Sequence, residues 1–182
     1  IDKRVLIDCS THARDYFELF PESNEVEVPV KDHREHDRIG HQYNKDYIYD
    51  HPAAPIHREP IENQIIPWMN EVAKLPKYQD GVSKAGPSNG EASPVPSLTI
   101  PDGLDDKIKL YNAAIQLGLP KFIIRPLTQA LVLQMHQTRL ENINLELIET
   151  TLGRLNGRAV DILDPVINHF VGTYALRCPE DR

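Results

Sequence analysis

The stretch from Leu104 to Met135, LDDKIKLYNAAIQLGLPKFIIRPLTQALVLQM, decides the fold that this sequence predicts. Apolar residues recur at helical spacing in its first half, which indicates a helix with one apolar face. They are Ile108, Tyr111, Ile115 and Leu119. Gly118 suits the left-handed turn that ends a helix, and a second apolar helix follows, with a bend or a restart at Pro126. We expect two closely packed helices that need partners from the rest of the chain.

Composition and charge limit the classes of function. The chain has 182 residues and a formal net charge of -7, which suits a single domain with an acidic surface. Such a surface repels phosphate backbones, so we expect no direct binding to nucleic acid. No apolar run approaches the length of a membrane span, and two cysteines far apart in the chain form no disulfide framework. We expect a nuclear or cytoplasmic protein that does not bind a membrane.

Short elements are expected on the N-terminal side of the central helices. Ser10 suits the N-cap of the helix that follows it. Ala13, Phe17 and Phe20 share one face of this helix. In Asn24–Val30, valines alternate with polar residues or proline, which predicts a strand with one apolar face.

Three more helices follow from the sequence. Ile61–Leu75 has an apolar face that includes the core candidate Trp68, with a kink or a restart at Pro67. A further helix is expected over Asn144–Leu155, and Asp164–Pro165 has the residue types that begin the last one. We therefore expect a mostly helical α+β fold with a small β-sheet.

The expected domain organisation is simple. We expect one domain over residues 1–182, with the helices at 140–178 as a C-terminal extension. The segment from 76 to 103 is rich in Pro, Gly and Ser and lacks apolar periodicity. Because it offers little apolar surface to offset its ordering entropy, we expect a flexible insertion at about 78–101.

The order of these segments resembles the BTB/POZ domain, in the form found in fungal proteins. The run KRVLIDCSTHARDYFELFPESNEVEVPV is similar to the family's stretch in which two helices lead to a strand. The matching positions are Val5, Leu6, Ser10, Tyr16, Phe17 and Phe20. The run LYNAAIQLGLPKFIIRPLTQAL is similar to the family's central helix pair, and VDILDPVINHFVGTYALR to its extra C-terminal helix. The resemblance implies a BTB/POZ-like helical cluster with a small sheet.

The resemblance also implies a function, because BTB/POZ domains dimerise and act as adaptors in transcription regulators and ubiquitin ligases. We expect a scaffold that forms a homodimer and binds another protein. The family's opening hairpin has no counterpart before Ile1, so we expect an exposed apolar surface on the N-terminal helices. The residues expected at this protein interface are Val5, Leu6, Tyr16 and Phe17.

A metal site is the alternative. His33, Glu35, His36 and His41 follow the pattern H-x-E-H-x4-H, and His51 and His57 come after them. Imidazoles and carboxylates are zinc ligands, so the alternative is a small zinc-binding protein or a metallo-hydrolase that uses the His33–His57 region. The spacing matches no standard zinc site, and we expect a solvated loop without metal or another cofactor.

Residues near Ser10 include the types found in a nucleophilic triad. Ser10 or Cys9 with His12 and Asp15 would provide the residue types for such a triad. Capping already explains Ser10, and the sequence contains no G-x-S-x-G motif. We therefore expect no catalytic residues and no enzyme activity.

Overall fold

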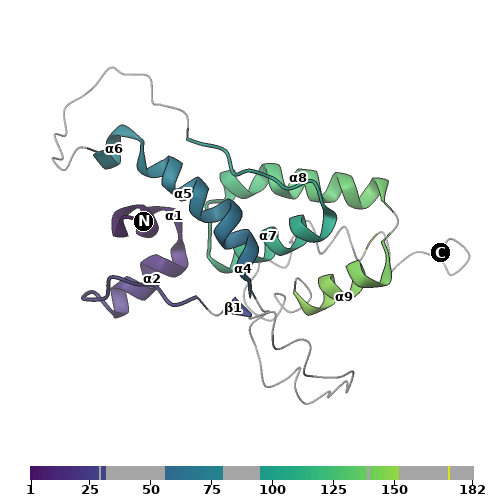
Figure 1. The fold of residues 1–182 in the computed structure, drawn as a ribbon, viewed down its shortest axis with the longest axis horizontal. Helices are drawn as coiled ribbons and strands as arrows, with labels where there is room; N and C mark the ends of the chain where they lie inside the picture. The colour runs from purple at the N-terminus through teal and green to yellow at the C-terminus, as the bar shows by residue number, and fades with distance from the viewer. Residues whose placement is uncertain (29, 32–55, 80–94, 139, 152–171, 173–182) are drawn as a thin grey trace, which may run out of the picture.

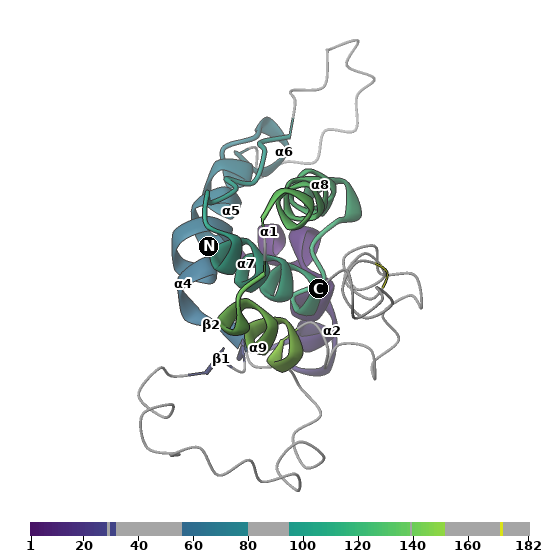
Figure 2. The ribbon, with the colours of Figure 1, turned by 90° about the vertical axis from the view of Figure 1, so that its right-hand side faces the viewer.

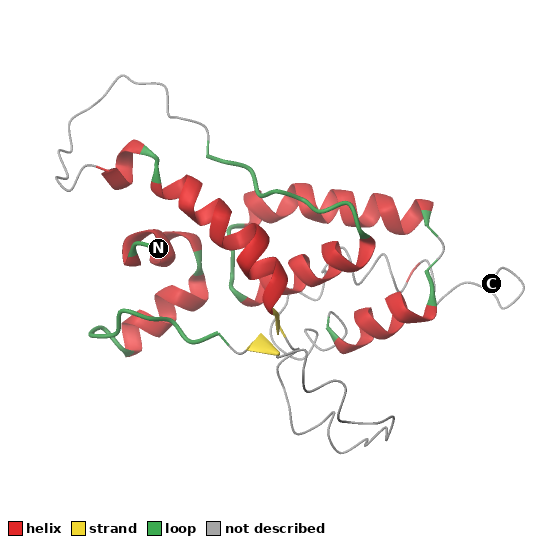
Figure 3. Cartoon of the chain, viewed as in Figure 1, coloured by secondary structure: helices red, strands yellow, loops and turns green. Residues whose placement is uncertain are grey.

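The computed structural model describes residues 1–28, 30–31, 56–79, 95–138, 140–151 and 172. Within these residues the chain is mostly helical, as the sequence predicts (Figure 1). The helical segments are α1 (Lys3–Cys9), α2 (Thr11–Leu19), α4 (Arg58–Pro60), η2 (Ile61–Ile65), α5 (Ile66–Ala73), α6 (Pro76–Gln79), α7 (Leu104–Gln116), α8 (Lys121–Gln137) and α9 (Asn142–Thr150). Two short strands, β1 (Val30–Lys31) and β2 (Ile56–His57), pair in parallel (Figure 3).

Helix α7 lies at the centre of the described fold and packs against α8, α9, β2, α4 and η2 (Figure 2). Leu110 on α7 and Leu127 and Leu131 on α8 are fully buried between these elements. Ile115, which the sequence places on the buried face of α7, is partly buried at the edge of this core. The buried face of α7 is therefore wider than the predicted stripe, and its centre lies closer to Leu110.

The second central helix does not restart at Pro126, although a restart is one of the two predicted outcomes. Helix α8 runs from Lys121 to Gln137 with Pro126 inside it. Proline lacks the N–H that would bond to the carbonyl of Phe122, one turn earlier. Both residues are exposed, so water can satisfy the carbonyl on this side of the helix.

The predicted strand over Asn24–Val30 is wrong in most of its length. Residues 24–28 are not in a strand, and β1 contains Val30 and Lys31. Alternation of apolar and polar residues makes extended backbone favourable, but a strand needs a partner for its backbone groups. The described partner, β2, spans two residues, so pairing is equally short.

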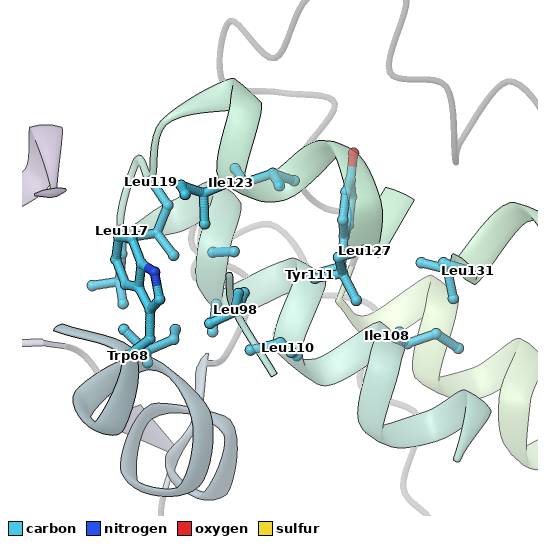
Figure 4. Close-up of a cluster of buried hydrophobic side chains, with 14 of the residues drawn as sticks. Trp68, Leu98, Ile108, Leu110, Tyr111, Leu117, Leu119, Ile123, Leu127 and Leu131 are labelled. Atoms are coloured by element: carbon cyan, nitrogen blue, oxygen red, sulfur yellow. The ribbon is translucent and has the colours of Figure 1, made fainter. Parts of the chain in front are cut away.

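The predicted break at Pro67 takes the form of a π-helical segment. In η2, five residues before Pro67 lose the α-helical register, and the N–H of Ile66 bonds to the carbonyl of Ile61. Pro67 then stands in the first turn of α5, which continues directly from η2, and its missing N–H leaves one carbonyl of the preceding helical residues without that bond. Trp68 follows and is buried in the core, as predicted (Figure 4).

The C-terminal end of the predicted insertion packs against the core. The indole N–H of Trp68 donates a hydrogen bond of 2.8 Å to the carbonyl of Pro96. Leu98, two residues later, is buried in the same hydrophobic cluster as Trp68 (Figure 4). The middle of the insertion, residues 80–94, lies outside the described residues. Leu98 and Ile100 supply apolar anchors that the Pro- and Ser-rich composition of the segment obscures.

A buried lysine joins the beginning of α7 to α8. The ammonium group of Lys107 donates to the carbonyl of Asp102 at 2.7 Å and to Oε1 of Gln134 at 2.6 Å. Nε2 of Gln134 in turn donates to the same Asp102 carbonyl at 3.3 Å. The helix spacing of this segment gave no indication that Lys107 is buried.

Helix α9 begins earlier than predicted. Its N-cap is Glu141, and the expected cap, Asn144, is the third helical residue in a reciprocal capping box with Glu141. Nδ2 of Asn144 also donates to Asp105 on α7 at 2.6 Å, which fixes α9 beside the central helix. The predicted end of this helix at Leu155 and the helix after Asp164 lie outside the described residues.

In the parts of the chain that the structure describes, no helix has both the length and the apolar character needed to cross a bilayer.

Candidate protein-interaction surface

The turn between α7 and α8 holds the start of α2. The backbone N–H groups of Thr11 and His12 donate to the carbonyls of Gly118 at 3.2 Å and Leu117 at 3.3 Å. The hydroxyl of Ser10 donates to the Leu117 carbonyl at 2.6 Å and accepts from the N–H of Ala13 at 3.0 Å. Exposed donors at the start of one helix thus satisfy carbonyls at the end of another, with favourable alignment of the two helix dipoles.

The contact is close because Gly118 has no side chain. Its φ of +65° is the left-handed conformation that the sequence predicts. A Cβ atom at this position would lie 1.7 Å from Oγ1 of Thr11. Glycine therefore serves two purposes here, since it permits the turn and allows α2 to approach.

A lysine fixes the other end of α2. The ammonium group of Lys3 donates to the carbonyls of Pro21 at 2.6 Å and Ser23 at 2.9 Å. It also lies 4.3 Å from the ring centroid of Phe17, where a cation–π interaction is favourable. Helix α2 is thus held at both ends, and side chains on its outer face project from a fixed support.

The structure separates the four predicted interface residues into two kinds. Val5 is fully buried and Phe17 is 5% exposed, so neither presents a surface to a partner in this structure. Leu6 and Tyr16 are partly exposed. Helix α1 packs against α5 and α2, and its apolar residues are used in these internal contacts.

Two residues that the sequence did not assign to the interface extend the surface from Tyr16. The Tyr16 ring lies edge-on to the buried Phe17, with centroids 5.9 Å apart, and 5.0 Å from the ring of Phe20. Phe20 is 55% exposed and Leu19 is 76% exposed. We call Tyr16, Leu19 and Phe20 the α2 patch. Its ring contacts form a continuous series from the buried Phe17, through Tyr16, to the exposed Phe20 at the end of α2.

The prediction that Phe20 shares one helix face with Ala13 and Phe17 is wrong, because Ala13 and Phe17 are buried and Phe20 is exposed. Phe20 is the C-cap of α2, with φ of −127° and ψ of 69°, and has left the helical path. Pro21 supplies the reason, because a residue before proline is disfavoured in the helical conformation. This signal was present in the sequence and could have indicated that Phe20 leaves the helix.

The segment that contains the α2 patch is acidic, and the two bases next to it, Lys3 and Arg14, bond to backbone carbonyls. The segment 15–27 contains Asp15, Glu18, Glu22, Glu25 and Glu27 and no lysine or arginine. All five are exposed. The patch therefore combines exposed apolar rings with negative charge.

The candidate catalytic residues near Ser10 are engaged with the backbone. Ser10 bonds to Leu117 and Ala13 as described above, and Nε2 of His12 lies 3.1 Å from the carbonyl oxygen of Glu27. These contacts give Ser10 and His12 structural roles in this arrangement. Asp15 is exposed on α2 and Cys9 is buried.

The candidate metal ligands fall largely outside the described residues. These are His33, Glu35, His36, His41 and His51. His57 is described, lies in β2 and is buried. Among the described side chains, no three His, Cys, Asp or Glu residues gather in a geometry that could hold a metal ion.

Comparisons with known proteins give no family. No protein-family model matches the chain. No curated protein matches it, and no solved structure matches it.

Proposed function

We propose that this chain is a protein–protein interaction module of the BTB/POZ kind, which associates with itself and binds another protein as an adaptor or scaffold. The observation that carries the proposal is the α2 patch, in which Leu19 and Phe20 are exposed at the C-terminal end of a helix anchored at both ends. Exposed apolar groups on a fixed support are typical of interfaces, because burying them costs little conformational entropy.

The order of the helices also supports the proposal. The helix pair α1–α2 precedes a short strand, and the pair α7–α8 forms the centre, in the order that the BTB/POZ resemblance implies. By the same resemblance we propose a nuclear or cytoplasmic role in transcriptional regulation or in ubiquitin ligase assembly.

The test compares two variants that remove an exposed apolar side chain. Leu19→Ser alters the α2 patch, and Ile143→Ser alters a side chain on α9 that is 62% exposed. Light scattering over a range of concentrations measures self-association, and affinity capture from the native cell identifies other partners. We expect Leu19→Ser to weaken association and Ile143→Ser to leave it unchanged.

The proposal fails if the protein stays monomeric at every concentration and captures no partner. Stoichiometric zinc in such a monomer would instead favour the alternative that uses the His33–His57 region.

A further inference from the structure

A second exposed face, on α8, complements the α2 patch. Phe122 is 64% exposed and Leu133 is 58% exposed, on a helix whose other face is buried in the core. Lys121 and Arg125 are exposed beside Phe122. We call Lys121, Phe122, Arg125 and Leu133 the α8 face.

The charges of the two surfaces are opposite. The chain carries a net charge of -7, yet residues 107–140 contain no aspartate or glutamate. The α8 face therefore has basic and apolar side chains without a neighbouring acid in its own helix. The α2 patch has apolar side chains within a segment that contains five acids and no base.

One copy of the chain does not bring these surfaces together. Leu19 and Phe122 each remain more than half exposed in the structure. In both orientations α8 lies on one side of α7 and α2 on the other (Figures 1 and 2). The start of α2 is bonded to the α7–α8 turn, and the helix runs away from it to Leu19.

We propose that the partner of the α2 patch is the α8 face of a second copy of this chain. This inference rests on the proposed function, since it names the surface used in self-association. In the contact, Leu19 and Phe20 of one copy bury apolar area against Phe122 of the other, and Arg125 lies among Glu18 and Glu22. Complementary charge selects the orientation of the contact, and apolar burial supplies most of its stability.

Because the two surfaces are different, the interface is isologous when two copies exchange both surfaces and heterologous when each copy uses its two surfaces with two different neighbours. Two copies close into a dimer when each offers its α2 patch to the other's α8 face, and an open arrangement adds further copies. In both cases the association depends on protein concentration and weakens as ionic strength rises.

Charge reversal tests the contact directly. One variant carries Glu18→Lys and Glu22→Lys, and the other carries Arg125→Glu. Among the described residues, these three side chains form no ion pair, so their replacement should leave the fold intact. Each variant alone brings like charges together and should weaken self-association about tenfold. An equimolar mixture of the two should associate again, because each variant retains the surface that the other has lost.

Three controls accompany the experiment. Glu146→Lys reverses an exposed charge on α9 and should not alter association. Phe122→Ser removes the apolar part of the α8 face and should weaken association as Leu19→Ser does. Circular dichroism and the fluorescence of Trp68 verify that every variant is folded.

The outcomes separate this inference from the proposed function. Restored association in the mixture supports the α2–α8 contact. If Leu19→Ser weakens association while Phe122→Ser and Arg125→Glu do not, the α8 face is not the partner, and the proposed function stands. If the unaltered protein is monomeric throughout, this inference is overturned, and capture of another protein decides whether the module proposal survives. If a monomeric chain binds a basic peptide, the self-association inference is likewise overturned and the module proposal survives.

Discussion

The hydroxyl of Ser10 donates a 2.6 Å hydrogen bond to the backbone carbonyl of Leu117, a residue 107 positions later in the chain. The same oxygen of Ser10 accepts the N–H of Ala13 and caps α2. One buried side chain thus starts a helix and attaches it to the central helix pair.

Replacing Ser10 with alanine should therefore lower the free energy of unfolding by about 1–3 kcal/mol, because the helix cap and one of the two hydrogen bonds to the Leu117 carbonyl are both lost. Thermal or urea unfolding followed by Trp68 fluorescence measures this loss. Ser23→Ala is the matched control, because the Ser23 hydroxyl bonds to Glu25 at an exposed site. An equal loss for both variants would contradict the structural role of Ser10.

Gly118→Ala should be more damaging, by about 2–4 kcal/mol, since left-handed backbone and a clash with Thr11 act together. Gly103→Ala provides the comparison. Its φ is −66°, and the new Cβ meets the flexible, exposed carboxylate of Asp106 at 3.0 Å. The melting temperature of the Gly103 variant should stay close to that of the unaltered protein.

Two leucines on α8 test the position of the core. Leu127 is fully buried, so Leu127→Ala should destabilise the domain by about 2–5 kcal/mol. Leu133→Ala removes the same atoms from the exposed side of the same helix and should change stability by less than about 0.5 kcal/mol. Similar losses would mean that α8 is rotated relative to this structure.

The buried Lys107 should be sensitive to its amide partner. Gln134→Leu removes one of the two acceptors of the ammonium group and should cost about 1–3 kcal/mol. In a Lys107→Met background there is no buried charge to satisfy, so the same replacement should cost much less. Chemical denaturation of the four proteins gives the coupling energy, and simple additivity would contradict the interaction.

Metal removal should have no effect on stability. A zinc ion held by the folded protein would raise its melting temperature by mass action, and a chelator would reverse this. We expect the same melting temperature with and without chelator, and no zinc by elemental analysis. A drop in melting temperature on chelation would contradict this prediction and would favour a metal site in the His33–His57 region.

The sequence predicts the central helices well because several independent signals agree there. Acidic residues at the start of α7, its apolar spacing and Gly118 at its end all specify the same helix. At Pro126 the local signal was misleading, since the effect of a proline depends on whether the lost bond faces water. The strand over residues 24–28 failed because alternation does not reveal whether a pairing partner exists.

The interaction surface was less predictable, because exposure also depends on contacts that the local sequence pattern does not show. Val5 and Phe17 are apolar residues on the correct helices, but α5 and Lys3 cover them, and this depends on contacts between distant segments. Pro21 could have indicated that Phe20 leaves the helix and does not share its buried face. The burial of Lys107 and the exposure of Phe122 depend on the rotation of α7 and α8 about their own axes relative to the core. The spacing of apolar residues in the sequence defines this rotation only approximately.

The bond from Ser10 to Leu117 also has a consequence for how the protein is made. During synthesis α1 and α2 leave the ribosome long before Leu117 and Gly118, so their final contacts must wait for the central turn. Closing so long a loop is slow compared with forming a local helix, and it raises the contact order of the domain. Although α1 and α2 precede the central turn in the chain, they are therefore among the last elements to complete their native contacts, and until then their apolar side chains are available to chaperones.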